Sequence, residues 1–190
     1  LDEGGTIMAL NINIKEEQAK SQQVIAEQGL RVLVCAGTGC VANGSLKVIE
    51  KFKELGADVS KLTEYDKMTI VPTGCHGFCE QGVLVIIPDK HVTYVKVKET
   101  DVEEIYESHV RNNQPVERLL YTDPASGQHV HKNEDINFYA KQTRTALANC
   151  GKINAECIEE AIAVRGYEAL ASVIESGNPD AVIDEIEKSG

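Results

Sequence analysis

Short apolar runs alternate with longer amphipathic stretches along the first half of the chain. The runs Arg31–Cys35 and Met68–Pro72 are rich in β-branched residues and lead into glycine-containing segments, which is typical of buried strands. Residues 14–28 and 45–55 instead repeat apolar positions at helical spacing, and Gly56 follows the second stretch as a stop signal. The pattern therefore predicts two helices, each followed by a buried strand.

A further pair of apolar runs follows the second predicted strand. Residues 83–88 and 91–97 flank Asp89-Lys90, which predicts a tight hairpin between antiparallel strands. Thr100 is expected to cap a helix, because the acidic residues that follow it would interact favourably with the positive end of that helix. Together these elements predict an α/β fold, in which a small mixed four-stranded sheet has flanking helices.

The second half of the chain has a different composition. Turn signals at residues 114–115, 122–124 and 126–127 surround an apolar patch at 116–121, which indicates a linker. Helical patterns then dominate, with helices expected at 138–149, 155–164 and 167–175 and from Pro179 onward. The expected parts are a cloning remnant or flexible N-terminus at 1–13, the α/β domain at 14–112, the linker at 113–136 and a small all-helical segment at 137–190.

The composition narrows the class of function. The 190 residues carry a formal net charge of −11, and an acidic chain without a basic stripe would repel nucleic-acid phosphates. No apolar run approaches the roughly 20 residues needed to span a bilayer, and no signal peptide opens the sequence. We therefore expect a cytoplasmic protein that binds no nucleic acid and does not insert into a membrane.

Four of the six cysteines form two closely spaced pairs, Cys35-x4-Cys40 and Cys75-x3-Cys79, each in a loop after a predicted strand. Glycines in these loops permit close backbone approach and leave N–H groups free to point at negatively charged sulfur. The glycines expected to do this are Gly37, Gly39, Gly74 and Gly77. The pattern predicts a metal centre with thiolate ligands.

The spacing within the pairs bears on which chemistry the cysteines serve. Disulfides suit secreted chains, and thiol exchange of the thioredoxin kind needs a C-x-x-C pair, which neither motif has. Structural zinc favours C-x2-C but tolerates wider spacing, whereas a [2Fe-2S] cluster spreads its four ligand sulfurs farther apart than one ion does. The spacing favours the cluster and leaves zinc, a free-thiol redox enzyme and unligated cysteines as alternatives.

Residues 28–98 resemble the thioredoxin-like [2Fe-2S] ferredoxins, which include the small iron–sulfur subunit of complex I. The resemblance rests on the two cysteine pairs and on the second pair being written Gly-Cys-x-Gly-x-Cys. It implies a thioredoxin-like fold in which Cys35, Cys40, Cys75 and Cys79 are the four cluster ligands. His76 is expected either to tune the cluster from outside the ligand set or to face solvent.

Residues 137–154 and 161–170 resemble the start of the NADH-oxidising flavoprotein subunit of complex I and its hydrogenase counterparts. The order of the two resemblances is that of the β subunits of electron-bifurcating, NAD-dependent [FeFe]-hydrogenases. The flavin-phosphate loop of that family and its NADH and [4Fe-4S] motifs do not follow in this sequence. FMN, NAD(H) and [4Fe-4S] are thus implied only for the remainder of a longer parent subunit, and no catalytic, flavin-binding or NAD-binding residue is expected here.

These resemblances imply one-electron transfer within an NAD(H)-linked multisubunit oxidoreductase, such as a hydrogenase or a formate dehydrogenase. The implied partners are its other iron–sulfur and flavin subunits and a ferredoxin. The alternative is a zinc-stabilised docking or assembly module without redox activity.

Three further pairs of residues carry chemistry and are expected to lie outside the metal centre: Cys150 and Cys157, His129 and His131, and Lys141 and Arg144. The two cysteines are expected to be packed or free thiols, and the two histidines to lie on the surface of the linker. The two cations share one face of a predicted helix, where they either dock a flavin domain or face solvent.

Overall fold

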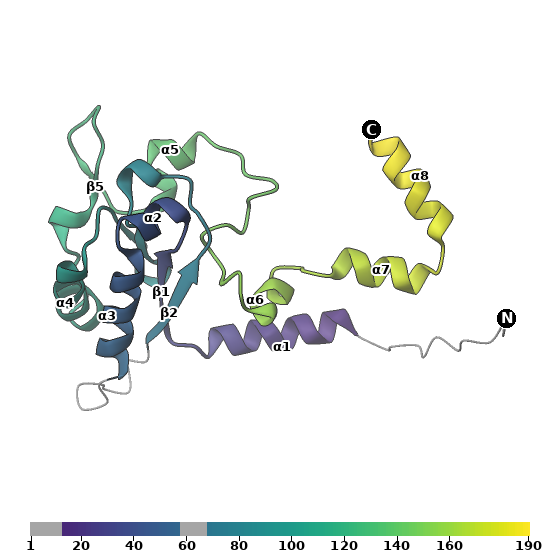
Figure 1. Ribbon diagram of the computed structural model, residues 1–190, viewed down its shortest axis with the longest axis horizontal. Coiled ribbons are helices and arrows are strands. Elements are labelled where there is room, and N and C mark those ends of the chain that lie inside the picture. The colour runs from purple at the N-terminus through teal and green to yellow at the C-terminus, as the bar shows by residue number, and fades with distance from the viewer. Residues whose placement is uncertain (1–12, 58–67) are drawn as a thin grey trace.

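The computed structural model describes residues 13–57 and 68–190. Its centre is a mixed sheet of four strands in the order β2-β1-β3-β4 (Figure 1). Strand β1 (Leu30–Cys35) runs parallel to β2 (Met68–Thr73) and antiparallel to β3 (Val85–Ile87), which pairs antiparallel with β4 (Val92–Tyr94). The predicted strands and hairpin are confirmed, with a 3-10 turn at Pro88–Lys90 joining β3 to β4.

Helix α3 (Ser45–Ala57) covers one face of the sheet together with the helical stretch that contains α4 (Val102–Glu104) (Figure 1). The buried face of α3 consists of Val48, Ile49, Phe52 and Leu55. Leu46, an apolar residue of the same helix, is 51% exposed, because a helical repeat of 3.6 residues places position 48 rather than 46 on the buried face. The main core lies between this helical layer and the sheet.

The helical stretch after the hairpin begins earlier than predicted. A 3-10 turn at Glu99–Asp101 leads into α4 and then into a π-helical stretch at Ile105–Arg111. The expectation that Thr100 is the cap is wrong, because the Asp101 carboxylate accepts a hydrogen bond of 2.8 Å from the backbone N–H of Lys98. The carboxylate at the third helical position therefore satisfies a backbone donor at the start of the stretch.

The predicted linker packs against the sheet along its apolar part. Val116, Leu119 and Leu120 are buried in the main core, and Leu120 forms a bridge to Tyr94 at the sheet edge. The segment contains a 3-10 turn (Glu117–Leu119), a small hairpin of β5 (Tyr121–Thr122) and β6 (His129–Val130), and a further 3-10 turn (Asn133–Asp135). The division between a domain and a linker at residue 113 stays a prediction.

Helices follow in the last quarter of the chain, as expected: α5 (Asn137–Ala140), α6 (Ile158–Ala163), α7 (Glu168–Ser176) and α8 (Pro179–Ser189). The helix predicted at 138–149 ends much earlier, at Ala140, and turns follow it. Lys141 and Arg144 therefore share no helix face. Glycines separate these short elements. Gly151 and Gly177 have a positive φ, and Gly166 packs tightly against the backbone carbonyl of Ala161.

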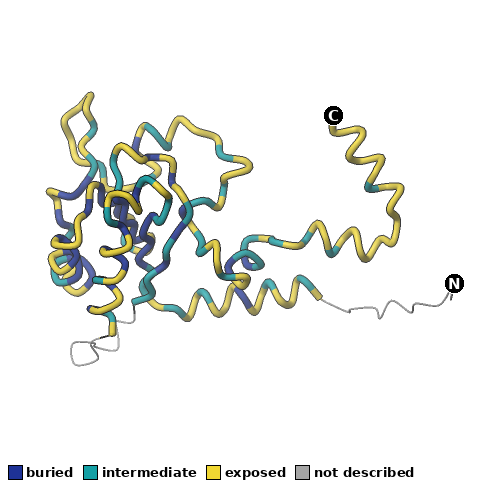
Figure 2. Tube along the Cα trace, in the orientation of Figure 1, coloured by how far each residue is buried: buried dark blue, intermediate teal, exposed yellow. Residues whose placement is uncertain are grey.

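Helix α6 packs beside α1 (Ile14–Ala26), away from the sheet, whereas α7 and α8 extend outward from the body of the molecule (Figure 1). A salt bridge of 2.6 Å between Arg31 and the buried Glu160 ties α6 to the start of β1. No residue of α7 or α8 is buried (Figure 2). Most of the extension predicted at 1–13 lies outside the described residues.

Candidate metal centre

The parallel pairing of β1 and β2 brings the two cysteine loops together. Cys35 at the end of β1 is in register with Thr73 at the end of β2, and the N–H of Ala36 donates to the Thr73 carbonyl at 2.9 Å. Because the carboxyl ends of neighbouring parallel strands meet at one edge of a sheet, the segments that follow them lie side by side. The topology therefore places both cysteine pairs at the same end of the sheet.

The first pair forms the buried side of the site. Cys35 and Cys40 are 1% and 2% exposed. Cys40 lies on a short helix, α2 (Thr38–Ala42), which begins after Gly37 and turns the chain back toward the end of β1. A hydrogen bond from the Cys40 thiol lowers the pKa of Cys35 to about 6, and the same contact, together with burial, raises the pKa of Cys40.

The second pair forms the exposed side of the site. The Sγ atoms of Cys75 and Cys79 lie 4.0 Å apart, and both residues are exposed. The backbone N–H of Gly77, which has a φ of +83°, donates to Cys75 Sγ at 3.3 Å. Cys79 begins a 3-10 turn (Cys79–Gln81) that leads the chain back toward the sheet. The site thus has one thiol pair toward the core and one toward solvent.

Close glycine contacts fit the two loops against each other. A Cβ atom on Gly37 would lie 2.8 Å from the Cβ and 3.2 Å from the Sγ of Cys75. A Cβ atom on Gly39 would lie 3.5 Å from Cys79 Sγ, whereas one on Gly74 would have no atom within 4 Å. The close approach of the two loops therefore requires a glycine at position 37 but not at position 74. Sequence reasoning missed Gly82, where a Cβ atom would lie 2.7 Å from Cys40 Sγ.

His76 lies between the exposed cysteines but does not face solvent. Its side chain is buried, and Nε2 lies 3.0 Å from the hydroxyl of Thr73. Burial and the nearby charge of Arg144 lower the pKa of His76 to about 4, so the ring is neutral at physiological pH. Gly151 packs so closely on the ring that any added Cβ would overlap it, and no signal in the sequence pointed to this contact.

An aromatic cluster covers the loop between the exposed cysteines. Phe78 is buried and stacks on Phe138, with ring centroids 4.5 Å apart and an angle of 8° between the rings. Tyr139 and Tyr121 meet Phe78 at larger angles, with centroids 5.6 and 5.5 Å away. Residues that follow the predicted linker therefore cover part of the metal centre.

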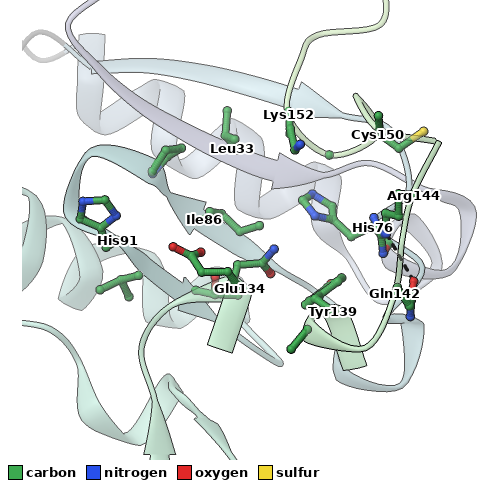
Figure 3. A pocket seen from close by; sticks show the side chains of 17 residues that line it. Leu33, His76, Ile86, His91, Glu134, Tyr139, Gln142, Arg144, Cys150 and Lys152 are labelled. Carbon is green, nitrogen blue, oxygen red and sulfur yellow. Dashed lines mark hydrogen bonds between the residues drawn. The ribbon is translucent and has the colours of Figure 1, made fainter. Parts of the chain in front are cut away.

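A cavity of about 890 Å³ adjoins this side of the site (Figure 3). It lies between Leu33 and Ile86 on the sheet and the segment 133–152, and Figure 3 shows His76, Arg144 and Cys150 close together at one end of it. The thiols of Cys35, Cys40, Cys75 and Cys79 do not line it. The cavity is thus adjacent to the candidate metal centre and separate from it.

The remaining candidates lie outside this site. Cys150 and Cys157 are half-buried, and the Cys157 thiol donates to a carboxylate oxygen of Glu159 at 3.1 Å. His129 is exposed and lies 3.3 Å from the Thr122 hydroxyl, and His131 is exposed as well. In residues 13–57 and 68–190, no group of three or more His, Cys, Asp or Glu side chains is arranged around a single metal ion. The four clustered cysteines are instead arranged as two pairs.

Comparison with known proteins shows which family this sequence matches. The family model for the thioredoxin-like [2Fe-2S] ferredoxins matches residues 23–109. The chain is 35% identical over 80 residues to a 2Fe-2S ferredoxin from Clostridium pasteurianum, covering 76% of that protein and 42% of this chain. It is 37% identical over 81 residues to a 2Fe-2S ferredoxin from Aquifex aeolicus (strain VF5), covering 71% of that protein and 43% of this chain.

Two further similarities concern a longer protein and a solved structure. A stretch of 50 residues is 48% identical to the NADP-reducing hydrogenase subunit HndC of Solidesulfovibrio fructosivorans. The stretch covers 26% of this chain and 10% of that subunit. The crystal structure of the wild-type thioredoxin-like [2Fe-2S] ferredoxin from Aquifex aeolicus matches at 32% identity with a TM-score of 0.45, covering 50% of this chain and 99% of that one. On the two ferredoxin sequence matches, the chain belongs to the thioredoxin-like [2Fe-2S] ferredoxins.

Proposed function

We propose that this chain transfers single electrons through a [2Fe-2S] cluster held by Cys35, Cys40, Cys75 and Cys79, as part of an NAD(H)-linked multisubunit oxidoreductase. The observation that carries the proposal is the meeting of the two cysteine pairs at one end of β1 and β2. Four thiolates are the usual ligand set of such clusters.

The residues present fit a two-iron group. Each cysteine pair brings two sulfurs together, and a two-iron group spreads its four ligand sulfurs farther apart than a single zinc ion does. Gly37 and Gly82 leave room beside Cys75 and Cys40 that any larger residue would fill. The Gly77 N–H already points at a ligand sulfur, and such donors stabilise negative charge on it.

A bound [2Fe-2S] cluster supplies one-electron oxidation and reduction at a potential that its surroundings set. The protein holds Cys35 and Cys40 in its core, where a low dielectric disfavours added negative charge. It presents Cys75 and Cys79 to solvent, so a redox partner can approach that side most closely. Electrons would enter and leave through the exposed pair.

The larger assembly is inferred from a sequence similarity and from the exposed apolar residues of two helices. The similarity to a hydrogenase subunit supports a place beside other iron–sulfur and flavin subunits, with a ferredoxin as a further partner. Helices α7 and α8 expose Leu170, Ile174, Ile183 and Ile186, a surface that suits further packing. FMN, NAD(H) and [4Fe-4S] sites would belong to the remainder of such a subunit, in the cytoplasm.

The described residues contain no helix that is both long and apolar enough to cross a membrane.

Reductive titration tests the proposal. The anaerobically purified chain should take up about one electron for each cluster and then give the electron paramagnetic resonance signal of a reduced [2Fe-2S] centre. A colourless protein that contains zinc and takes up no electron would contradict the proposal and favour a docking module. A metal-free protein that reacts stoichiometrically with disulfide reagents would favour a free-thiol enzyme.

A further inference from the structure

Arg144 reaches back across the chain to the loop between the exposed cysteines. Its Nη2 atom donates to the backbone carbonyl of His76 at 2.6 Å, a contact between residues 68 positions apart (Figure 3). Its guanidinium carbon lies 5.0 Å from the centre of the Tyr139 ring, so the cation also stacks on an aromatic face. The side chain is therefore held from two directions.

The loop that Arg144 contacts also lies against Phe138. A Cβ atom on Gly77 would lie 3.6 Å from Nη2 of Arg144 and 3.9 Å from the Phe138 ring. The stacking of Phe138 on Phe78 anchors the same loop one residue farther along. Arg144 and Phe138 thus both lie against the segment between Cys75 and Cys79.

We propose that Arg144 is a positioning residue for this loop, and that its positive charge raises the reduction potential of the group that Cys75 and Cys79 help to hold. The inference rests on the proposed cluster. Reduction adds one negative charge to the site, and a nearby fixed cation stabilises the reduced form more than the oxidised form. The hydrogen bond to His76 fixes the distance at which that charge acts.

The experiment compares four forms of the full chain: wild type, Arg144→Gln, Arg144→Lys and Lys141→Gln. Lys141 is a matched control, because it is an exposed cation three residues away. Reduction potentials come from a visible-absorbance titration. Hydrogen exchange of the peptide that contains residues 74–80, followed by mass spectrometry, reports the loop independently of electron transfer.

Arg144→Gln should shift the reduction equilibrium about tenfold toward the oxidised form. For a one-electron couple, this shift lowers the reduction potential by about 59 mV. Exchange in the loop should become severalfold faster. Arg144→Lys should restore most of the potential but not the slow exchange, because lysine keeps the charge and lacks the planar fork. Lys141→Gln should change neither quantity.

The inference is overturned if Arg144→Gln shifts the potential no more than Lys141→Gln does and leaves loop exchange unchanged. Should Arg144→Gln fail to fold, Arg144→Lys tests the positioning role instead. Loop exchange as slow in Arg144→Lys as in the wild type would then overturn the inference. A wild-type chain without a cluster would instead contradict the proposed function. Comparing hydrogen exchange of the loop in the cluster-free wild type and Arg144→Gln would still show whether Arg144 positions the loop.

Discussion

The Sγ atom of Cys75 lies 4.0 Å from that of Cys79 on the exposed side of the site, while Cys35 and Cys40 are buried beneath them. Replacing any of the four by Ala should abolish or severely weaken the cluster spectrum, because the methyl side chain supplies no ligand to iron. Cys150→Ala is the matched control and should keep the spectrum. Full retention of the spectrum in one of the four variants would remove that residue from the ligand set.

The two pairs should differ in their contribution to folding without metal. Cys35→Ser places a hydroxyl in the core and should lower the free energy of unfolding of the cluster-free chain by about 1–3 kcal/mol. Cys79→Ser is exposed and should change it by less than about 0.5 kcal/mol. Urea denaturation measures both, and equal effects would contradict the assignment of a buried and an exposed side.

Gly37 should be sensitive to the smallest substitution. Gly37→Ala would place a methyl group 2.8 Å from the Cβ of Cys75, and relieving that overlap should cost about 1–3 kcal/mol and reduce the iron content severalfold. Gly74→Ala is the control, because a methyl group there meets no atom within 4 Å. Similar iron contents in the two variants would show that the loops do not need this close approach.

The salt bridge between Arg31 and Glu160 should hold α6 against the rest of the molecule. Arg31→Met leaves the Glu160 carboxylate buried with the backbone N–H of Asn154 as its remaining hydrogen-bond donor, and should cost about 3 kcal/mol. Lys51→Met removes a largely exposed pair with Glu54 and should cost less than about 1 kcal/mol. Proteolysis between residues 140 and 158 should accelerate only in the first variant.

His109 should make stability depend on pH. It is buried with Nδ1 2.7 Å from the Tyr94 hydroxyl, and burial, with smaller contributions from Lys90 and His131, lowers its pKa to about 4. The unfolded chain, with a histidine pKa near 6.5, binds more protons between these values. The free energy of unfolding should therefore be fully retained above about pH 6.5 and fall by up to about 3 kcal/mol as the pH drops toward 4.

His109→Gln should weaken this pH dependence and leave the part that the buried His76 contributes, whereas His91→Gln, at an exposed turn position, should leave it as in the wild type. Urea denaturation at several pH values, with all variants in the same metal state, gives the comparison. An unchanged slope in His109→Gln would contradict the role assigned to that side chain.

Local patterns predicted the strands of the sheet and the position of each cysteine pair after a strand. The strands at 31–35 and 68–72 are short runs rich in β-branched residues, and their parallel pairing follows once a helix connects them. Cys35 ends one of these strands, so its position at the sheet edge follows from the sequence. The helix at 45–57 has all the residues of its buried face within a few turns, although it includes Gly56, which the sequence predicted as its stop.

Contacts between distant segments could not be predicted in this way. The aromatic stack of Phe78 on Phe138 and the bond from Arg144 to His76 join residues that no periodic pattern relates. The same contacts explain why the helix predicted at 138–149 ends at Ala140, since Arg144 leaves the helical path to reach the loop. Gly82 and Gly151 matter only because Cys40 and His76 lie against them in the folded chain.

The metal content of the chain distinguishes an iron–sulfur cluster from a zinc site. Iron, acid-labile sulfide and zinc should be measured in the anaerobically purified chain, with visible spectra before and after dithionite. The account predicts about two iron and two sulfide for each chain and a spectrum that bleaches on reduction. About one zinc for each chain and a featureless spectrum would contradict it.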